Sequence, residues 1–496
     1  MEYVFSTAQT PLELLRYAFS TPYQSGNLDS SSFEENLLKV ILLINERLHV
    51  HGDIQKDSNP KIEACKLVLA NSFSQKGFDL GDYNQTFRFA FTKSVDFFEY
   101  VSKNNYFKPI YNRFITKIGI SNYRQYIKTI IGVFAVMKLN AEHTLKEIRV
   151  EIWMGDFPFI EERIQDSLIS KNVLDFLSID IDDVILLKKN EDYVAFRAKP
   201  LIKQKDGTYA VYNLIFLFER LFNSLYFDFQ HIATKELHLP KFGIEYKERF
   251  FEETLLHSYI SRINNHNRYL AISGVEAKNI KENGAPDYFL KNRENNSIIL
   301  FEHKDIRIKG SVKQSRNVNI IIDEYKNKIL SVVENHGEKL KHPTPIGIGQ
   351  LTNHIEEIRK SSFIWDLNTN KDDIVYPVLV LTDINIIPDG LPYLMNQWFY
   401  ENLKARGIDA KKNKPLIVLE VSTLLLYSNE FKENGLEYFM DRYYKMIEDT
   451  ENNVSNNLFL SLANMSVSFS EYMLNAYPKN FTDLHEEFKD IVFNQE

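Results

Sequence analysis

Two short stretches decide how the second half of this 496-residue chain folds: GAPDYFL at residues 284–290 and SIILFEHK at residues 297–304. The second stretch is an apolar run of strand-forming residues, and the first places the turn signal Pro286-Asp287 ahead of another apolar run. The polar residues Asn292 to Asn296 between them predict a turn. We therefore expect two neighbouring strands joined as a hairpin.

The patterns on either side of this hairpin predict an α/β core. Apolar spacing predicts a helix before the hairpin and helices after it, and β-rich runs predict one strand before it and two later strands. The order helix, three strands, helix, strand is that of an α/β domain whose middle strands present side chains at one edge. The expected helices are 245–263, 318–333 and one starting near 349, and the remaining strands are 269–278, 375–382 and 415–421.

The hairpin would gather two carboxylates and an ammonium group around one point. Glu302 and Lys304 are two residues apart on a strand, so their side chains point to the same face. Asp287, at the start of the preceding strand, can be brought beside them. Carboxylate oxygens, with a backbone carbonyl such as that of His303, suit Mg²⁺ or Mn²⁺, and Lys304 could orient a water or neutralise a phosphate.

Glu-x-Lys spacing alone is a weak signal, because it also occurs at 245/247, 276/278 and 324/326. The pairs at 245 and 324 lie in helical patterns, and the pair at 276 ends a strand with only a helix upstream. The alternative for Asp287 is a turn-stabilising role, and for Glu302 and Lys304 it is a solvent-facing pair on an edge strand. Glu302, however, interrupts an apolar run typical of a buried strand, where an unpaired charge would cost several kcal/mol.

Pro286-Asp287 followed by Glu302-His303-Lys304 resembles the signature of the PD-(D/E)XK nuclease superfamily, whose shared core is the restriction endonuclease-like fold. The resemblance covers roughly residues 244–425. It implies that Asp287 and Glu302 are metal ligands and that Lys304 is the catalytic lysine.

Two further site residues come from the same resemblance. Members of the superfamily often carry a glutamate on the first core helix, which implies Glu252, with Glu248 and Glu253 as competitors. Some carry a glutamine on the helix after the third strand, which implies Gln350, although Gln314 lies nearer in the sequence.

Outside the core, we expect a mostly helical recognition or regulatory domain over 1–240, with a β-hairpin within 193–213, and a helical extension over 426–496 packed on the nuclease-like domain of 241–425. Two basic stretches are candidate nucleic-acid contacts. Residues 101–139 mix cations with aromatics, which also fits an ordinary helical core. The loop after the catalytic strand carries Arg307, Lys309, Lys313 and Arg316.

Composition excludes several classes of protein. The net charge of −8 means that a polyanion must meet a local patch, and the single cysteine, Cys65, excludes an internal disulfide and multi-cysteine zinc sites. No apolar stretch approaches the roughly 18 residues that span a bilayer. The expectation is a cytoplasmic protein without a membrane partner.

These features predict a Mg²⁺- or Mn²⁺-dependent endonuclease acting on DNA. It could be the effector of a prokaryotic defence or restriction system, either as a homo-oligomer or with a partner from that system. The alternative is a catalytically inactive nuclease-like protein that binds nucleic acid or serves as a scaffold.

Overall fold

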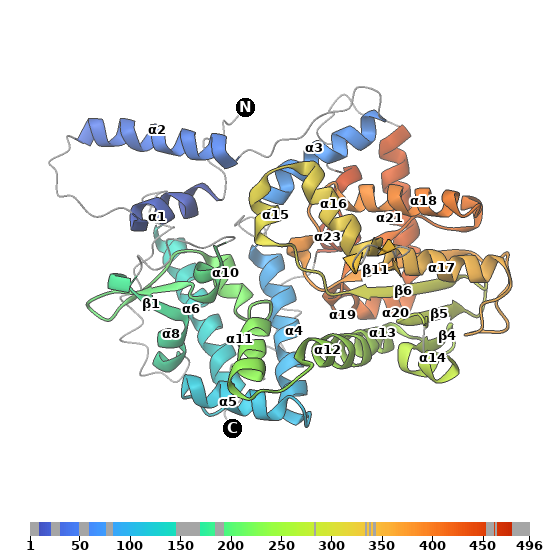
Figure 1. Ribbon diagram of the computed structural model, residues 1–496, viewed down its shortest axis with the longest axis horizontal. Coiled ribbons are helices and arrows are strands. Elements are labelled where there is room, and N and C mark those ends of the chain that lie inside the picture. The colour runs from blue at the N-terminus through green and yellow to red at the C-terminus, as the bar shows by residue number, and fades with distance from the viewer. Residues whose placement is uncertain are drawn as a thin grey trace. The chain divides into compact units, whose positions relative to one another are not determined.

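The structure, a computed structural model, divides into two compact units (Figure 1). Unit 1 comprises 1–49, 77–243 and 479–496, and unit 2 comprises 50–76 and 244–478. Each unit is described separately below. The described residues are 9–20, 30–48, 59–75, 83–144, 169–183, 193–281, 284–332, 335–336, 339–340, 344–452, 461 and 464–478.

Unit 2 is built on a mixed five-stranded sheet in the order β12-β11-β6-β5-β4. The first three strands in sequence pair antiparallel, and β11 and β12 then add parallel to β6 on its other side. This confirms the α/β class and the expected order of strands. The bounds are β4 (Tyr269–Ser273), β5 (Tyr288–Asn292), β6 (Ile298–Lys304), β11 (Val375–Leu381) and β12 (Ile417–Glu420).

Helices cover both faces of this sheet. Before β4 the chain forms the π-helical segment η6 (Glu245–Leu256) and α13 (His257–Ile263), and α17 (Ile348–Arg359) precedes β11. Phe251 of η6 stacks on His303, with ring centroids 5.3 Å apart. Phe289, which the strand register turns to the opposite face, packs against Phe363 at 5.5 Å, and Phe363 contacts His354 of α17.

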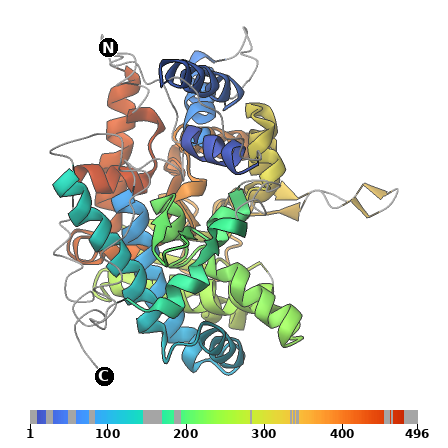
Figure 2. The same cartoon turned by 90° about the vertical axis from the view of Figure 1, so that its left-hand side faces the viewer.

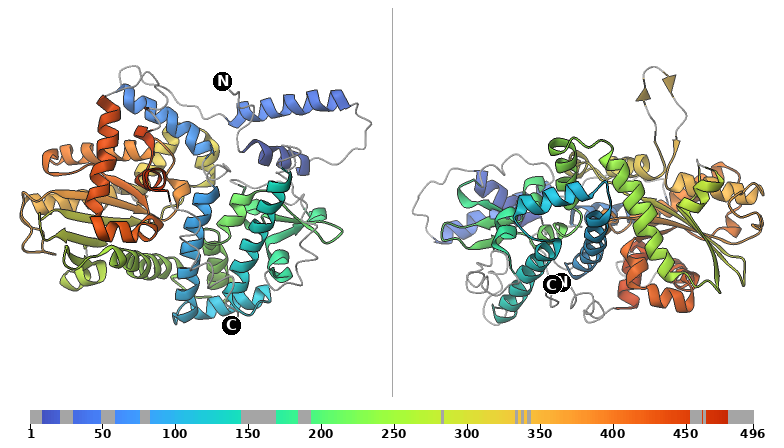
Figure 3. Two further views of the ribbon diagram at one scale, coloured as in Figure 1. Left: turned by 180° about the vertical axis from the view of Figure 1, so that it is seen from behind. Right: turned by 90° about the horizontal axis from the view of Figure 1, so that it is seen from below.

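The remaining helices and strands complete unit 2 (Figures 2 and 3). The short strands between α16 and α17 form two separate pairs, β7 with β10 and β8 with β9. The bounds are α14 (Gly274–Ile280), α15 (Gly310–Ser315), α16 (Val318–Ile329), β7 (Ser331–Val332), β8 (Asn335–His336), β9 (Lys339–Leu340), β10 (Thr344–Pro345), η7 (Ile384–Ile386), α18 (Leu391–Ala405), η8 (Ala410–Lys412), α19 (Ser422–Leu426), α20 (Ser428–Asn434), α21 (Leu436–Asn452) and α23 (Phe469–Ala476).

The strand expected over 269–278 is wrong in its second half. Ser273 ends β4 and caps α14: its Oγ accepts a hydrogen bond from the backbone N–H of Glu276, whose carboxylate accepts one from the Ser273 N–H. This reciprocal pair satisfies two donors at the start of a helix. Glu276 and Lys278 therefore lie on a helix.

Unit 1 is mostly helical and contains a three-stranded sheet, β1-β2-β3. The bounds are α1 (Thr10–Ser20), α2 (Ser30–Leu48), α4 (Tyr83–Lys103), α5 (Lys108–Ile118), α6 (Tyr123–Thr144), α8 (Lys171–Leu177), β1 (Ser178–Asp180), α9 (Val194–Ala198), β2 (Leu201–Lys203), β3 (Tyr209–Val211), α10 (Leu214–Glu219), α11 (Leu225–His231) and η5 (Ile232–Glu236). The short α12 (Phe242–Ile244) lies where the chain passes from unit 1 to unit 2.

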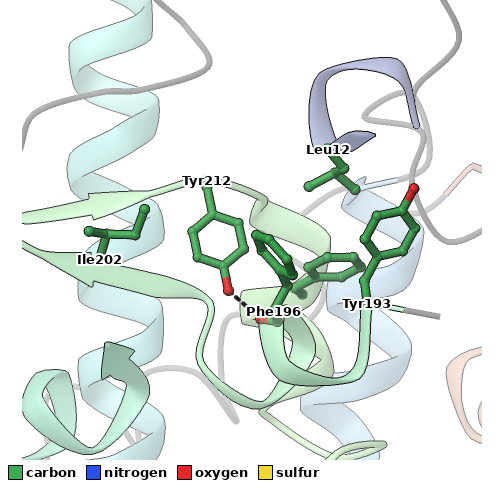
Figure 4. Packing of buried hydrophobic residues seen from close by; sticks show 6 residues of the cluster. Leu12, Tyr193, Phe196, Ile202 and Tyr212 are labelled. Carbon is green, nitrogen blue, oxygen red and sulfur yellow. Dashed lines mark hydrogen bonds between the residues drawn. The ribbon is translucent and has the colours of Figure 1, made fainter. Parts of the chain in front are cut away.

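The hairpin expected within 193–213 forms from a shorter segment, because 194–198 is helical and only β2 and β3 pair antiparallel. Aromatic packing explains the helix. Figure 4 shows Phe196 of α9 beneath Tyr212, whose hydroxyl donates to the Phe196 carbonyl oxygen at 2.7 Å. Leu12 of α1 and Tyr193 belong to the same buried cluster.

The basic aromatic stretch 101–139 is core and not an open groove over its described side chains. Phe107, Phe114 and Tyr126 are fully buried, and Phe114 packs against Tyr126 with ring centroids 5.5 Å apart. Two of the cations, Arg113 and Lys117, pair with Glu236 at 2.7 and 2.9 Å. The aromatic side chains needed for base stacking are therefore used inside unit 1.

Helix α3 (Pro60–Gln75) belongs to unit 2, although its sequence position suggested the N-terminal domain. Its Cys65 and Leu69 are fully buried, and Phe73 packs on Tyr325 of α16 at 6.3 Å. The apolar face of α3 thus completes the core of a unit whose main segment begins 169 residues later in the sequence, counted from Gln75 to Ile244. Local pattern predicts such a helix but not its partner.

Gly390 gives a test of this packing. Its φ is +84°, and a Cβ atom there would lie 2.3 Å from the Cys65 carbonyl oxygen of α3. We expect Gly390→Ala to lower the melting temperature and to speed amide hydrogen exchange across 60–75, because the methyl group pushes α3 away. The matched control is Gly407→Ala, where φ is +68° and nothing lies within 4 Å.

In the control variant, the free energy of unfolding should fall only by the cost of placing alanine in a left-handed backbone conformation, about 1–2 kcal/mol. Equal hydrogen-exchange profiles across 60–75 in the two variants would contradict the packing of α3 on the Gly390 turn.

Candidate active site

The register of the β5–β6 hairpin places Asp287 beside Glu302. Tyr288 pairs with Phe301, so the next position along the ladder sets Asp287 opposite Glu302. Residues directly opposite in an antiparallel pair point to the same face, which is also the face of Lys304. The three side chains therefore meet at the end of the sheet where β4 ends, β5 begins and β6 ends.

Backbone hydrogen bonds hold Asp287 in this position. Its carbonyl oxygen accepts from the Gly274 N–H at 2.9 Å, and its Oδ2 accepts from the His303 N–H at 2.7 Å. A Cβ atom at Gly274 would lie 2.8 Å from the Asp287 carbonyl oxygen, so only glycine permits this approach. Asp287 is thereby tied through its carboxylate to β6 and through its backbone carbonyl to the first residue of α14.

Glu302 is fully buried and only half satisfied. Its Oε1 accepts a hydrogen bond from Lys304 Nζ at 2.6 Å, whereas its Oε2 is buried without a hydrogen-bond partner. Burial, followed by repulsion from Asp287, raises the pKa of Glu302 to about 8, despite the opposing charge of Lys304. A cation bound at this oxygen would replace the proton and offset the unfavourable burial of the charged form.

Glu252 of η6 adds a third carboxylate. Together with Asp287 it lines a small pocket of about 10 Å³, the room of roughly one water molecule or ion. Burial, then the charge of Asp287, raises the pKa of Glu252 to about 7. The stacking of Phe251 on His303 fixes η6 beside β6 and so positions Glu252 at this end of the sheet.

Lys304 is the positive centre of the group. Burial by itself would lower its pKa, but the carboxylates of Glu302 and Asp287 outweigh burial and raise the pKa above its ordinary value. Lys304 therefore acts as a permanent cation and not as a proton acceptor. His303 points away from it, stacked on Phe251 and within 3.2 Å of Thr382 Oγ1, so its carbonyl and not its ring matches the expected ligand.

Three mutually repelling carboxylates with one unsatisfied buried oxygen fit a divalent cation. Asp287, Glu302 and the His303 carbonyl would hold it, and Glu252 would be a further ligand. Among the described residues, however, no three His, Cys, Asp or Glu side chains are already grouped closely enough to hold a metal ion.

The remaining candidate site residues differ in their exposure and in their contacts. Glu248 is exposed, and Glu253 lines the small pocket but pairs with Arg249 at 3.3 Å. Gln350 has a capping role, since its Oε1 accepts from the Gly347 N–H at 2.9 Å at the start of α17, and it makes no hydrogen bond to the carboxylates. The side chain of its competitor, Gln314, lies outside the described residues.

Two lysines near the carboxylates were missed from the sequence. Lys278 of α14 lines the same small pocket as Glu252, and Lys247 and Lys278 both oppose the rise in the Glu252 pKa. The pattern Ser273-x-x-Glu276 is a capping box. This motif in the sequence could have predicted helix α14, on which Lys278 lies beside the pocket.

The basic loop after β6 leads away from Lys304. Arg307 lies 3.5 Å from Asp305, and Lys309 is 68% exposed and 4.0 Å from Glu324. Lys313 lies on α15, and Arg316 ends that helix with a left-handed backbone, φ 53°. The four cations thus follow β6 directly along the chain.

In comparisons with protein-family models, curated proteins and solved structures, no family, protein or structure matched this chain. Within the described part of the chain, no helix has the length and apolar character to cross a membrane.

The two raised carboxyl pKa values predict how stability depends on pH. A group that holds its proton more tightly in the folded protein contributes stability below its ordinary pKa of 4.5, and this is lost as the pH rises through about 7 for Glu252 and about 8 for Glu302. In EDTA, we therefore expect the melting temperature to fall between about pH 5 and about pH 8.5, and Glu302→Gln to gain stability relative to wild type over that range.

The matched control is Glu401→Gln, the same chemical change at an exposed position of α18. Its stability difference from wild type should stay constant with pH. A Glu302→Gln difference that is equally flat would contradict the strained, buried state of Glu302.

Proposed function

We propose that this protein is a metal-dependent nuclease that hydrolyses phosphodiester bonds in DNA. The observation that carries the proposal is the β5–β6 register, which sets Asp287 opposite Glu302 with Lys304 on the same face. The element order helix, three antiparallel strands, helix and parallel strand supports a restriction endonuclease-like core.

Each residue has a distinct part in this chemistry. A bound Mg²⁺ or Mn²⁺ would stabilise the developing phosphate charge and acidify an attacking water. Asp287, anchored by the His303 N–H, and Glu302, with its open Oε2, supply the carboxylates. Lys304 keeps its charge and can move from Glu302 to a phosphate oxygen or to the attacking water. Glu252 is placed to hold a water or a second ligand position.

The basic loop supports a nucleic-acid substrate. Because the whole chain carries a net charge of −8, phosphate contacts have to be concentrated locally, and Arg307, Lys309, Lys313 and Arg316 follow the catalytic strand directly. Unit 1, a separate helical body, would recognise the substrate or regulate cleavage, as in an effector of a prokaryotic defence or restriction system.

A second candidate function is an inactive nuclease-like protein that binds nucleic acid or acts as a scaffold. One observation favours it: the described residues contain no preformed group of three metal-binding side chains. In that case the Glu302–Lys304 pair would be a buried structural ion pair.

Cleavage assays test the first proposal. Purified protein should nick supercoiled plasmid with Mg²⁺ or Mn²⁺ and not in EDTA, and Glu302→Ala and Lys304→Ala should each lower the rate by about 10²-fold or more. The matched control is Lys326→Ala, which removes the lysine of another Glu-x-Lys pair, on α16. It should cleave at the wild-type rate.

Melting curves must show that the inactive variants remain folded. Metal-independent cleavage, or full activity of folded Lys304→Ala, would contradict the assigned site.

Metal binding separates the two candidate functions without any cleavage assay. Calorimetric titration with Mn²⁺ should give saturable binding to the wild-type protein, weakened about tenfold or more in Asp287→Asn because one charged ligand becomes neutral. Saturable binding that Asp287→Asn leaves unchanged would place the metal elsewhere. Wild-type protein that binds no Mn²⁺ would favour the scaffold.

A further inference from the structure

Unit 2 contains a second, larger pocket that the nuclease proposal does not use. It has a volume of about 400 Å³, within the range of roughly 300–1,000 Å³ typical of sites that enclose small molecules. Helices α18 and α21 and the segment 414–416 ahead of β12 form its walls. The catalytic carboxylates are not among its lining residues.

Tyrosine side chains form much of the wall. Tyr393 and Tyr400 are contributed by α18, and Tyr443 and Tyr444 by α21. The hydroxyls of the α21 pair donate to backbone carbonyls, Tyr443 to Val467 at 2.9 Å and Tyr444 to Pro415 at 2.6 Å. Tyr443 is only 3% exposed and lies behind the wall, whereas Tyr444 is half-buried. The anchored ring of Tyr444 is therefore the one of this pair that can stack against a flat ligand.

Two polar groups of α18 in the lining have no hydrogen-bond partner among the described residues. The side-chain amide of Gln397 and the hydroxyl of Tyr400 make no hydrogen bond with the described residues. Their neighbour Asn396 uses its Oδ1 to accept from the Leu416 N–H at 2.8 Å. Positions 393, 396, 397 and 400 share one face of a helix, so the amide and hydroxyl groups converge on the pocket.

The charges in the lining disfavour an anionic ligand. Lys414, the one cation among the described lining residues, already pairs with Asp441 at 2.7 Å. Glu451 accepts from the Tyr393 hydroxyl at 2.9 Å and lies 3.7 Å from Lys61, and Glu448 is exposed. A phosphate group here would meet two carboxylates and no uncommitted cation among the lining residues.

We propose that this pocket binds an uncharged adenine nucleoside. The half-buried ring of Tyr444 suits stacking on a planar base, and the Gln397 amide offers the donor and acceptor that match N7 and N6 of adenine. Among the described lining residues no cation is uncommitted, which favours the nucleoside over its phosphates. This inference does not depend on the nuclease proposal, because it uses different residues and a different part of unit 2.

The test is calorimetric titration of the full-length protein with adenosine, guanosine and ATP. Adenosine should bind saturably, and guanosine and ATP should each bind at least about threefold more weakly. Gln397→Ala should weaken adenosine binding by about three- to tenfold by removing the base contacts, and Tyr400→Phe, which removes one hydroxyl, by a smaller factor.

Glu401→Ala is the control variant, since Glu401 is the exposed neighbour of Tyr400 on α18 and does not line the pocket. It should bind adenosine as the wild type does. No saturable adenosine binding up to about 5 mM, equal binding by Gln397→Ala, or tighter binding of ATP than of adenosine would each overturn the proposal.

Discussion

The pairing of β5 with β6 is the constraint on which the candidate site depends. With Tyr288 opposite Phe301, Asp287 faces Glu302, and a shift of one residue in this register would turn Asp287 to the other face of the sheet. The register is fixed by apolar burial: Phe289, Leu290, Leu300 and Phe301 are all fully buried. Exposing them to slip the strands would cost far more than the repulsion between the carboxylates gains.

The repulsion between these carboxylates destabilises the folded protein when they are charged, and neighbouring groups offset part of that cost. Burial and mutual repulsion raise the pKa values of Glu302 and Glu252, so both carboxyl groups are strained when charged. Lys304 offsets part of this strain through its hydrogen bond to Glu302, and the His303 N–H offsets part of it at Asp287. Groups destabilised in this way are typical of functional sites, where a ligand or substrate supplies the missing charge.

Unit 2 also shows how one sheet can support two chemically distinct regions. At the ends of β5 and β6 the lining is charged and closely packed around a pocket of about 10 Å³. Between α18 and α21 the lining is aromatic and amide-rich around a pocket of about 400 Å³. The first region suits a small cation, and the second suits a flat uncharged molecule, so the two sites would not compete for a ligand.

The sequence by itself determined the elements whose pattern is local. Apolar runs and turn signals in residues 284–304 predicted the two strands, the two-residue spacing put Glu302 and Lys304 on one face, and the helix 245–263 followed from its apolar spacing. The predictions were wrong where a short local motif, such as a helix cap, lay within or beside a longer pattern. The strand pattern continuing beyond Ser273 hid a capping box, and Gln350, placed in the site by resemblance, is engaged at a helix end.

Only the tertiary structure decided which elements pack together. It assigned helix 60–75 to unit 2 and buried Phe107, Phe114 and Tyr126 in unit 1. It also brought Lys278 and Glu252 to one pocket with Asp287. The reason is physical: periodicity records which face of an element is apolar, whereas the partner of that face depends on contacts between residues far apart in the chain.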